Sequence, residues 1–500
     1  MDQGLALEVL LSGESALLTG PAGTGKTYVL NQFIRLSKHN GKHVSVTATT
    51  GLAATHLGGS TLHSWAGIGV HDMLPSGFFE HMAKGRREII EKTDVLIIDE
   101  ISMLHDYRLD MVDEVCRIVR RKDTPFGGIQ VVMSGDFFQL PPVNRDGSRQ
   151  GGFVVNSTVW QELDPIILYM DTQYRQKEGD DLLDILTHLR AGDLRRHHAE
   201  RLLARADVTP LEGSVLTELH TVNVDVDRIN ELHLQKLEGD ELIYQQHTTG
   251  SESYVENLQR SVLAPAMLTL KKGALVMAVK NDANRRYVNG SIGVVMDFEP
   301  GSEYPVVEFV SGKIVTMQPD TWELRDGDKK RASISQIPLR LAWAITVHKS
   351  QGMTLDAARI DLRRAFVEGM GYVALSRVKD INNLYLTGIN RMALAVSADA
   401  QEIDARLRLR AHADSQRFAH LQAKAEKRDL KALTPKRKSV TGWADKIAKM
   451  REVHPNAYRP WTDADDNALK QHFANGATIK QLSKKLGRHE GSIIMRLQKH

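Results

Sequence analysis

The first 140 residues alternate short apolar runs with segments whose hydrophobic positions recur at a helical period. Apolar runs of strand length lie at residues 15–20, 44–48, 95–99 and 129–135, and helical patterns begin at Thr27, Leu52 and Tyr107. Strands that alternate with helices in this way predict a parallel sheet with helices on both faces. We therefore expect an α/β domain at the amino-terminal end.

A second region with the same alternation begins near Pro165 and resumes at Ile337. Between residues 267 and 336 the apolar runs are short and of strand type, and the dipeptides Asn289-Gly290 and Pro300-Gly301 mark turns between them. This pattern predicts a small β-barrel inserted into a second α/β domain. The expected domains are residues 1–164, residues 165–266 together with 337–395, and the inserted residues 267–336.

The last hundred residues differ from the rest of the chain. After Asn390 the pattern is charge-dense and helical to about Leu433, and TPKRKS at residues 434–439 predicts an exposed linker, so residues 396–440 are expected to be a charged helix and linker. From Trp461 the pattern predicts three short helices with a tight turn before the last. Residues 441–500 thus resemble a helix-turn-helix or Myb-like DNA-binding module. A basic three-helix module that binds another protein is the alternative.

The net charge of +3 conceals an uneven distribution. Residues 401–500 contain 22 Lys and Arg against 11 Asp and Glu, whereas residues 1–400 contain 43 against 51. The tail therefore carries +11 and the remainder −8. This separation predicts a basic appendage on a nearly neutral body.

The single cysteine, Cys116, excludes an internal disulfide and fits a reducing compartment. It shares one helical face with Val112, Val115 and Val119, so we expect a packed thiol without chemistry. Residues 1–13 contain no basic segment with a long apolar stretch, and no apolar run approaches the roughly 20 residues of a membrane span. We expect a soluble, intracellular protein, as in a bacterial-type cytoplasm, with no membrane partner.

The sequence GPAGTGKT at residues 20–27 matches a phosphate-binding loop and lies between a predicted strand and a predicted helix. Glycines let backbone N–H groups approach the phosphates, Lys26 contacts the β and γ oxygens, and the Thr27 hydroxyl ligates Mg²⁺. A mere glycine-rich turn is the alternative, and the position between strand and helix disfavours it. The predicted ATP contacts are Gly20, Pro21, Ala22, Gly23, Thr24, Gly25, Lys26 and Thr27.

Two carboxylates follow the apolar run VLII at residues 95–98. One acid suffices for a metal, and a second permits activation of water, as hydrolysis of the γ-phosphate requires. We therefore predict that Asp99 holds Mg²⁺ and that Glu100 polarises the attacking water. An ordinary strand end is the alternative, which the preceding phosphate loop disfavours.

Three later segments separate this chain from the many other ATPases with a phosphate loop. They are GDFFQLPPV at residues 135–143, AWAITVHKSQGMT at 342–354 and GYVALSR at 371–377. With DEISML at residues 99–104 and PFGGIQ at 125–130, they follow the order and spacing of superfamily-one DNA helicases. The chain resembles the petite-integration-frequency (PIF) family of these enzymes, which is related to the RecD-type helicases. The resemblance covers about residues 1–395.

The resemblance implies two RecA-like domains, an inserted SH3-like domain and roles for further residues. By resemblance, Gln3 reads the adenine and Gln139 senses the γ-phosphate. Arg175 and Arg377 would act as arginine fingers across the domain cleft, and Gly352 joins the nucleotide-binding positions. An independent argument supports the fingers, because charge on the transferred phosphoryl group needs fixed cations.

Contacts to single-stranded DNA are expected across the tops of both α/β domains. Hydroxyl, amide and short basic groups suit contact with the DNA backbone, and an aromatic side chain such as Trp65 suits stacking on a base. Local capping or core packing is the alternative for each position. The candidates are Thr49, Thr50, His63 and Trp65 on the first domain, and Asn223, His348, Lys349 and Ser350 on the second.

The sequence therefore predicts an ATP- and Mg²⁺-dependent DNA helicase that moves 5′-to-3′, a direction that rests on the resemblance alone. Its expected partners are single-stranded DNA and duplex or fork DNA, and it is expected to act as a monomeric motor. G-quadruplexes and RNA–DNA hybrids stay open as substrates. An ATP-dependent translocase that remodels protein–DNA complexes is the first alternative. A nucleotide-switched DNA-binding protein is the second, and Glu100 with the two arginines disfavours it.

Overall fold

The structure is a computed structural model of the 500-residue chain. It describes residues 1–57, 59–69, 71–144, 149–176, 179–210, 216–280, 282, 286–287, 289–326, 329–355, 357–428, 455–456, 463–488, 493 and 496–497. The chain forms two compact units, one of residues 1–307 with 315–434 and one of residues 308–314 with 435–500.

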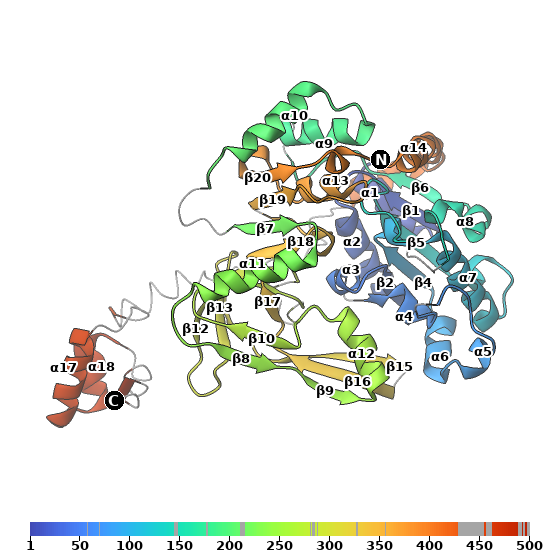
Figure 1. The fold of residues 1–500 in the computed structure, drawn as a ribbon. Helices are drawn as coiled ribbons and strands as arrows, with labels where there is room; N and C mark the ends of the chain where they lie inside the picture. Colours follow the sequence, from blue (N-terminus) through green and yellow to red (C-terminus); the bar gives the residue numbers. More distant parts are fainter. Residues whose placement is uncertain are drawn as a thin grey trace. The chain divides into compact units, whose positions relative to one another are not determined.

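A six-stranded sheet forms the centre of the first α/β domain (Figure 1). Its strand order is β3-β2-β4-β5-β1-β6, and all five pairings are parallel. The predicted apolar runs form its central strands, which are buried because helices cover both faces. The strands are β1 (Ala16–Thr19), β2 (Val44–Ala48), β3 (Ser60–Thr61), β4 (Val95–Asp99), β5 (Gln130–Gly135) and β6 (Ile166–Tyr169). The predicted α/β fold with a parallel sheet is confirmed.

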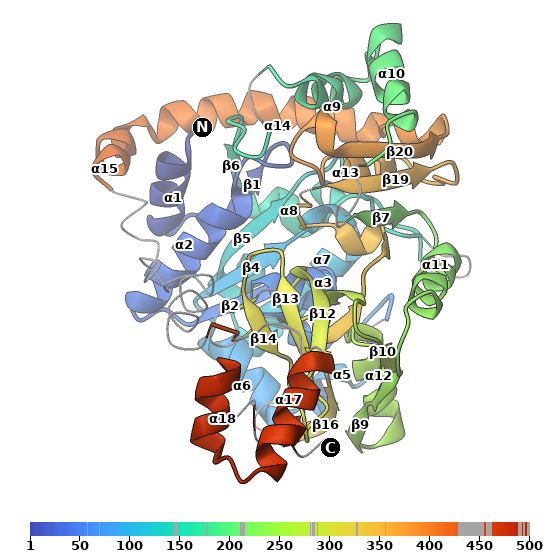
Figure 2. The ribbon, with the colours of Figure 1, turned by 90° about the vertical axis from the view of Figure 1, so that its left-hand side faces the viewer.

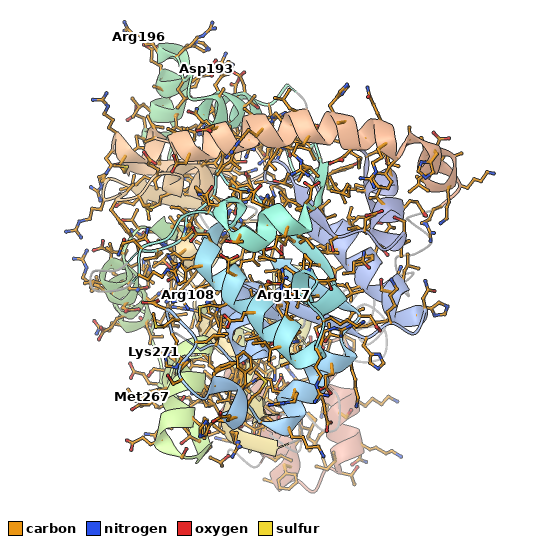
Figure 3. All side chains as sticks on the ribbon, turned by 90° about the vertical axis from the view of Figure 1, so that its right-hand side faces the viewer. Arg108, Arg117, Asp193, Arg196, Met267 and Lys271 are labelled. Carbon is orange, nitrogen blue, oxygen red and sulfur yellow. The ribbon has the colours of Figure 1, made fainter. Side chains whose placement is uncertain are left out.

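The longest helix of the first domain, α7 (Asp106–Arg120), packs by one apolar face. That face buries Cys116 with its valine neighbours, so the predicted packed thiol is confirmed, and burial raises the thiol pKa. Arg117, a partly buried residue of the same helix (Figure 3), pairs with Asp113 at 2.7 Å. The other helices are α1 (Gln3–Leu11), α2 (Lys26–His39), α3 (Gly51–His56), α4 (Leu62–Ala66), α5 (Phe78–His81), α6 (Lys84–Lys92) and α8 (Thr158–Leu163), with short 3₁₀ turns η1 (Ile101–Met103), η2 (Pro125–Gly128) and η3 (Val154–Asn156).

The first sheet extends past the boundary predicted at residue 164. Strand β6 pairs with β1, and helix α14 (Ala398–Arg417) covers this edge (Figure 2). The Asp414 carboxylate accepts the backbone N–H of Ile167 at 2.8 Å, and the Tyr169 hydroxyl donates to Asp404 at 2.6 Å. The charged helix predicted before the linker is thus packed against the first α/β domain, because its apolar positions lie on one face. It continues into η8 (Ala419–Leu421) and α15 (Gln422–Lys427), which contacts α1.

A second parallel sheet, of order β18-β7-β19-β20, forms the second α/β domain (Figure 1). Its strands are β7 (Thr217–His220), β18 (Ala344–Thr346), β19 (Ala358–Leu362) and β20 (Leu384–Ile389). Its helices are α9 (Asp181–Ala191), α10 (Arg196–Leu203), α11 (Asn223–Gln235) and α13 (Met370–Leu375), with the 3₁₀ turns η4 (Ala204–Ala206), η5 (His348–Ser350), η6 (Ile381–Asn383) and η7 (Met392–Leu394). The two α/β domains are the RecA-like pair that the sequence predicts.

Antiparallel β structure interrupts the second domain between α11 and β18, and it is longer than the predicted residues 267–336. Strand β8 (Leu242–Gln245) pairs with β10 (Met267–Leu270), and β17 (Leu339–Leu341) pairs with β11 (Leu275–Ala278), so the insertion begins earlier and ends later. The sheet orders are β14-β13-β12-β11-β17, β15-β16-β9 and β10-β8. The remaining elements are β9 (His247–Gly250), α12 (Glu252–Ser261), β12 (Ile292–Phe298), β13 (Pro305–Phe309), β14 (Ile314–Thr316), β15 (Asp320–Asp326) and β16 (Lys329–Gln336).

The described part of the tail contains helices α17 (Asp463–Ala474) and α18 (Ile479–Leu486). A capping box of Thr478 and Gln481 starts α18, and Gly487 ends it in the left-handed conformation. A small core of Leu469, Leu482, Leu486 and Ile493 joins the helices. Trp461, Thr462, Lys436, Arg437, Lys438 and Lys499 lie outside the described residues.

No helix within the described residues is both long and apolar enough to cross a membrane.

Candidate functional site: a nucleotide site shared by two domains

The phosphate loop, residues 20–27, lies where strand β1 ends and helix α2 begins. Gly20 has φ of 132°, and a Cβ there would stand 2.2 Å from the Met170 carbonyl oxygen, so only glycine fits. The Lys26 ammonium donates to the Gly20 and Pro21 carbonyls at 2.8 and 2.9 Å. Burial lowers the pKa of Lys26, while the carboxylates of Asp136 and Glu100 oppose this. A cation is thus held at the centre of the loop, beside carboxylates.

Asp99 and Glu100 stand together at the carboxyl end of β4. Asp99 is buried, and burial raises its pKa although the Glu100 backbone N–H and Ser134 partly offset this. Glu100 has a left-handed backbone with φ of 54°, unusual for a non-glycine residue and common at functional sites. This turn ends the strand and separates the two carboxylates. Burial, together with Asp99, raises the pKa of Glu100 to about 7.

A second-domain side chain holds the Glu100 carboxylate. The Gln351 amide donates to Glu100 Oε2 at 2.9 Å, across 251 residues of sequence. Gln351 is buried and sits after η5, and the following Gly352, with φ of 78°, forms the turn. Gln351 stands in the motif at residues 342–354, but the sequence predicts no role for it. Because the motif alone does not show which of its polar side chains turns inward, only the fold reveals this contact.

Gln3 and Tyr174 flank the phosphate loop at Gly25. The Gln3 amide lies 3.5 Å from the Thr24 carbonyl oxygen, and a Cβ at Gly25 would stand 2.2 Å from Gln3 Nε2 and 3.6 Å from Tyr174 Cδ2. The Tyr174 backbone N–H donates to the Gly23 carbonyl at 3.0 Å, and its ring is 59% exposed. An amide and an exposed aromatic ring therefore border the same side of the loop. Gln3 is a predicted nucleotide contact, whereas the position of Tyr174 beside the loop is known only from the fold.

Arg175 and Arg377 lie near Glu100 and pair with no carboxylate within the described part of the chain. Arg377 is fully buried, and its guanidinium donates to the carbonyls of Val373, Ser350 and Met353 and to the Ser376 hydroxyl, at 2.8 to 3.3 Å. Arg175 is half-buried and donates to the Ser376 carbonyl at 2.7 Å. Burial and Arg175 lower the pKa of Arg377 to about 9, so it stays charged at neutral pH. The site thus holds two cations without direct ion-pair partners.

Gln139 follows β5, is 7% exposed, and its Oε1 has no hydrogen-bond partner among the described residues. A buried amide oxygen without a donor costs about 1–3 kcal/mol. A ligand or water that donates to Gln139 would remove this cost. A water molecule that donates to Gln139 Oε1 could link this side chain to the nucleotide, because the phosphate oxygens only accept hydrogen bonds.

A buried polar network joins the phosphate loop to the second domain through Asp136. The Tyr372 hydroxyl donates to Asp136 at 3.1 Å and accepts the backbone N–H of Ala22 at 3.0 Å. Arg190 donates to Asp136 at 2.6 Å and lies over the Phe138 ring at 4.1 Å. Burial alone would raise the pKa of Asp136, but the positive charges of Arg190 and Lys26 have the larger opposite effect. The pKa of Asp136 is therefore below its usual value. Burial raises the pKa of Tyr372 to about 12, so its hydroxyl keeps its proton.

Among the first-domain candidates for DNA contacts, Trp65 is wrong as a stacking residue. It is 8% exposed and belongs to the core cluster of the domain, because α4 turns its ring inward. Thr49 donates to the Glu100 carbonyl at 2.9 Å, and the Thr50 hydroxyl accepts the Ala53 N–H at 3.2 Å. Burial and Arg108 lower the pKa of His63 to about 4, so His63 offers a hydrogen bond but no charge.

Among the second-domain candidates, Ser350 is wrong as a DNA contact. It is fully buried, and its hydroxyl donates to the Val347 carbonyl at 2.8 Å, so it supports the turn that holds Arg377. The Lys349 ammonium donates to Asn223 Oδ1 at 3.3 Å. Burial lowers the pKa of both Lys349 and His348. Asn223, His348 and Lys349 are brought together at the carboxyl end of the second sheet.

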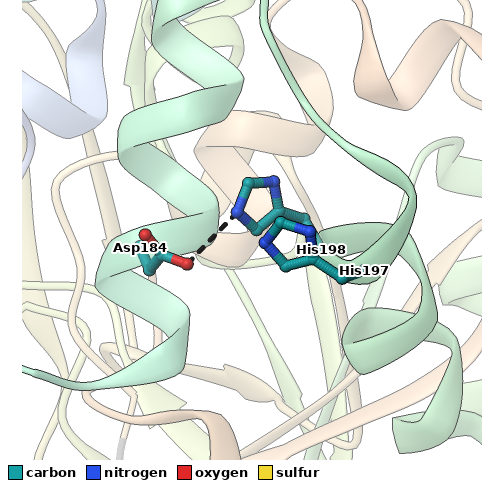
Figure 4. Close-up of side chains that lie close together, drawn as sticks. All are labelled: Asp184, His197 and His198. Atoms are coloured by element: carbon teal, nitrogen blue, oxygen red, sulfur yellow. Dashed lines mark ion pairs between the residues drawn. The ribbon is translucent and has the colours of Figure 1, made fainter.

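A separate cluster of Asp184, His197 and His198 places three ligand-type atoms within 4.8 Å of one another (Figure 4). The His198 Nδ1 accepts the Arg195 backbone N–H at 3.0 Å, so the proton sits on Nε2, which pairs with Asp184 at 3.2 Å. Arg201 also pairs with Asp184 at 3.4 Å. The His198 Nδ1 lone pair and the Asp184 carboxylate thus already have partners within the chain, and these contacts join α9 to α10.

The chain is similar to known helicases over the region that carries this site. A model of the PIF1-like helicase family matches residues 6–199. The chain is 38% identical over 470 residues to an ATP-dependent DNA helicase Pif1 of Psychrobacter sp., covering 82% of this chain and 71% of that one. The crystal structure of Pif1 helicase from Candida albicans is similar, with 35% identity, a TM-score of 0.72, and coverage of 81% and 98%. A Bacteroides Pif1 helicase in complex with ADP-AlF3 and single-stranded DNA is 31% identical, with a TM-score of 0.63 and coverage of 81% and 96%.

Proposed function

The chain belongs to the PIF1-like helicase family, and we propose that it hydrolyses ATP to move 5′-to-3′ along single-stranded DNA and to unwind duplex, forked or structured DNA. The observation that carries this proposal is the contact of Gln351 with Glu100, because it shows that residues of both α/β domains form the proposed ATP site. A site of this kind links the nucleotide state to domain closure. The Bacteroides relative with bound nucleotide and single-stranded DNA supports the same two ligands here.

Thr27 and Asp99 are the residues that would hold Mg²⁺. The Thr27 side chain is exposed at the start of α2, and the buried Asp99 carboxylate has a raised pKa that a divalent cation would lower. Oxygen ligands of these two kinds fit Mg²⁺. When bound, the ion neutralises charge on the β- and γ-phosphates.

Side chains of the chain itself are assigned to phosphate binding, activation of water and stabilisation of charge. Lys26 releases its two loop carbonyls and pairs with the β- and γ-phosphate oxygens. Glu100 orients the attacking water and accepts its proton. Arg175 and Arg377 stabilise charge that develops on the transferred phosphoryl group, and both contact the segment around Ser376 in the second domain.

Gln3 and Tyr174 form the base end of this nucleotide site. We assign the Gln3 amide to the hydrogen-bonding edge of adenine and the exposed Tyr174 ring to its face, because both border Gly25. We assign Gln139 to the γ-phosphate side, where a water molecule that donates to its unpaired amide oxygen would link it to the phosphate. The assignments of Gln3 and Gln139 extend the family resemblance, whereas that of Tyr174 rests on its position beside Gly25.

Strand displacement on matched duplexes with a 5′ or a 3′ single-stranded tail tests the proposal. The 5′-tailed duplex should be unwound with ATP, and the 3′-tailed duplex should not. Lys26→Ala is the control, since it removes the phosphate-binding cation while binding of single-stranded DNA without nucleotide should survive. Unwinding of the 3′-tailed duplex alone would reverse the direction. Displacement of a bound protein without unwinding of either duplex would favour the translocase instead.

A further inference from the structure

Three neighbouring parallel strands of the second sheet end at one edge. The sheet order β18-β7-β19 places the segments after these strands side by side, and they carry His348, Asn223 and Phe366. The sequence predicts DNA contacts at His348 and Asn223 and none at Phe366. The carboxyl edge of a parallel sheet is the usual location of ligand contacts in α/β proteins.

Phe366 is an aromatic side chain on the surface of this edge. It is 59% exposed, and its ring stacks on His348 at a centroid distance of 6.1 Å with 17° between the planes. Burial lowers the pKa of His348, so the inner ring of the pair is neutral. We name this pair the 348/366 platform. A single exposed apolar side chain is ordinary, but the Phe366 ring lies nearly parallel to a neutral aromatic ring while most of the residue stays exposed.

Hydrogen bonds hold the segment that directly precedes Phe366. The Asn390 amide donates to the carbonyls of Ala365 at 2.8 Å and Arg363 at 3.2 Å, and the Ala365 N–H donates to the Leu362 carbonyl. Because this segment is already ordered, ligand binding does not carry the entropy cost of ordering Phe366. More of the free energy of stacking therefore contributes to affinity.

Polar and cationic groups surround the platform. Lys349 donates to Asn223, and Arg364, 69% exposed on its side chain, pairs with Asp225 in the first turn of α11 at 3.2 Å. An aromatic surface beside cationic side chains is an arrangement that binds single-stranded nucleic acid, since bases stack on the ring and phosphates pair with the cations. The ion pair with Asp225 holds the Arg364 side chain near the start of α11.

We propose that Phe366 stacks on a base of the bound strand, with the 348/366 platform as the base-binding subsite of the second domain. This inference rests on the proposed function. It replaces the stacking role that the sequence suggested for Trp65, whose ring is in the core. The ligand is a nucleobase of single-stranded DNA, and any base suffices because every base has a stacking face.

Equilibrium binding of two oligonucleotides of equal length tests the platform, one of thymidines and one whose every sugar lacks a base. Phe366→Ala should weaken binding of the thymidine strand by about 5- to 150-fold, the range expected when one base stack is removed, and leave binding of the abasic strand unchanged. Phe366→Trp should keep the preference for bases. Met267→Ala, which truncates an exposed apolar side chain of β10, is the matched control and should change neither affinity.

Two outcomes would overturn the proposal. Equal weakening for both strands would mean that Phe366 supports the backbone contacts or the fold, and unchanged affinity for both would mean that no base lies on the ring. Neither outcome would contradict the proposed function, because that function is tested separately by strand displacement with the unaltered protein.

Discussion

The Gln351 side chain of the second domain donates a hydrogen bond to the Glu100 carboxylate of the first domain, at 2.9 Å. Burial and Asp99 raise the pKa of Glu100 to about 7, and the Gln351 hydrogen bond opposes them. Near neutral pH, therefore, the protonation of the proposed base depends on a residue of the other domain. We expect closure of the domains to affect both the position and the charge of this base.

Gln351→Ala should move the acidic limb of the ATPase pH profile to higher pH. The mutation removes a hydrogen bond that favours the carboxylate, so the pKa of Glu100 rises, and the base is protonated over a wider range below that pKa. The measurement is kcat/KM for ATP across the acidic and neutral range with saturating single-stranded DNA. Titration of ATP itself is common to both proteins, so only the difference between them counts. An unchanged limb would remove Gln351 from control of Glu100.

Arg377→Ala and Arg175→Ala should each reduce turnover by about 10³-fold or more, the scale of arginine-finger effects, with ATP affinity nearly unchanged. Arg377→Lys should also be impaired, since an ammonium cannot satisfy the four groups that the guanidinium reaches. Arg201→Ala, an arginine at the α9–α10 joint, is the control. Thermal denaturation of each variant identifies loss of folding. Turnover near that of the unaltered protein would show that the tested arginine is not a finger.

The phosphate loop and the strand ends could be predicted from sequence because their signals are local. An apolar run that ends in Asp99 and Glu100 is a buried strand whichever residues surround it, and the loop pattern at residues 20–27 needs only its strand and helix. Domain boundaries were less accurate. Strand β6 belongs to the first sheet, but its apolar residues fit either domain, and only the partner β1 decides.

Contacts between distant segments could not be predicted in the same way. Trp65 and Ser350 stand in motifs that suit DNA binding, but helix α4 turns the indole ring into the core and η5 buries the serine hydroxyl. Gln351 and Tyr372 reach the first domain from more than 200 residues away. No spacing in the sequence encodes such a pair, because the inward direction of a side chain depends on the whole fold.

Tyr372→Phe should lower DNA-stimulated turnover more than it raises the KM for ATP. The change removes only the hydroxyl that joins Ala22 of the phosphate loop to Asp136, so the coupling between the domains weakens while the nucleotide contacts remain. Asp136 also loses a donor in a buried site, which should reduce stability by about 1–3 kcal/mol. Steady-state ATP hydrolysis and denaturant unfolding measure the two effects. Tyr254→Phe, at an exposed tyrosine, should change neither. A rise in KM alone would instead assign Tyr372 to nucleotide binding.

Tyr174→Ala should raise the KM for ATP by about tenfold, the effect of removing one ring contact worth about 1.4 kcal/mol. Gln3→Ala should act in the same direction. The KM for CTP should change much less in the Gln3 variant, because its amide is assigned to the edge of adenine. Hydrolysis of both nucleotides by both variants gives the comparison. Equal effects of Gln3→Ala on the two nucleotides would show that it supports the phosphate loop through Thr24 and does not read the base.

We propose that the basic tail is a duplex or junction anchor outside the motor. Two groups of basic residues differ in their contacts within the described part of the module. Arg488 and Arg496 pair with Asp465 and Asp466, at 2.8 and 2.5 Å, so they hold the module together. The side chains of Lys480, Lys484 and Lys485 are exposed on α18. These lysines, and not the two arginines, are the expected phosphate contacts.

A truncation after Lys431 keeps α14 and α15, which pack on the first domain, and should therefore retain ATPase stimulated by single-stranded DNA. Affinity for forked DNA should fall, and the slope of log affinity against log salt should become shallower by roughly 0.9 for each duplex phosphate that the tail no longer neutralises. A full-length variant with Lys480, Lys484 and Lys485 changed to Gln should reproduce most of this weakening while the paired arginines keep the module folded. Fork titrations at several salt concentrations compare the unaltered, truncated and substituted proteins. Equal affinities and slopes for all three would exclude the DNA anchor and favour a module that binds another protein.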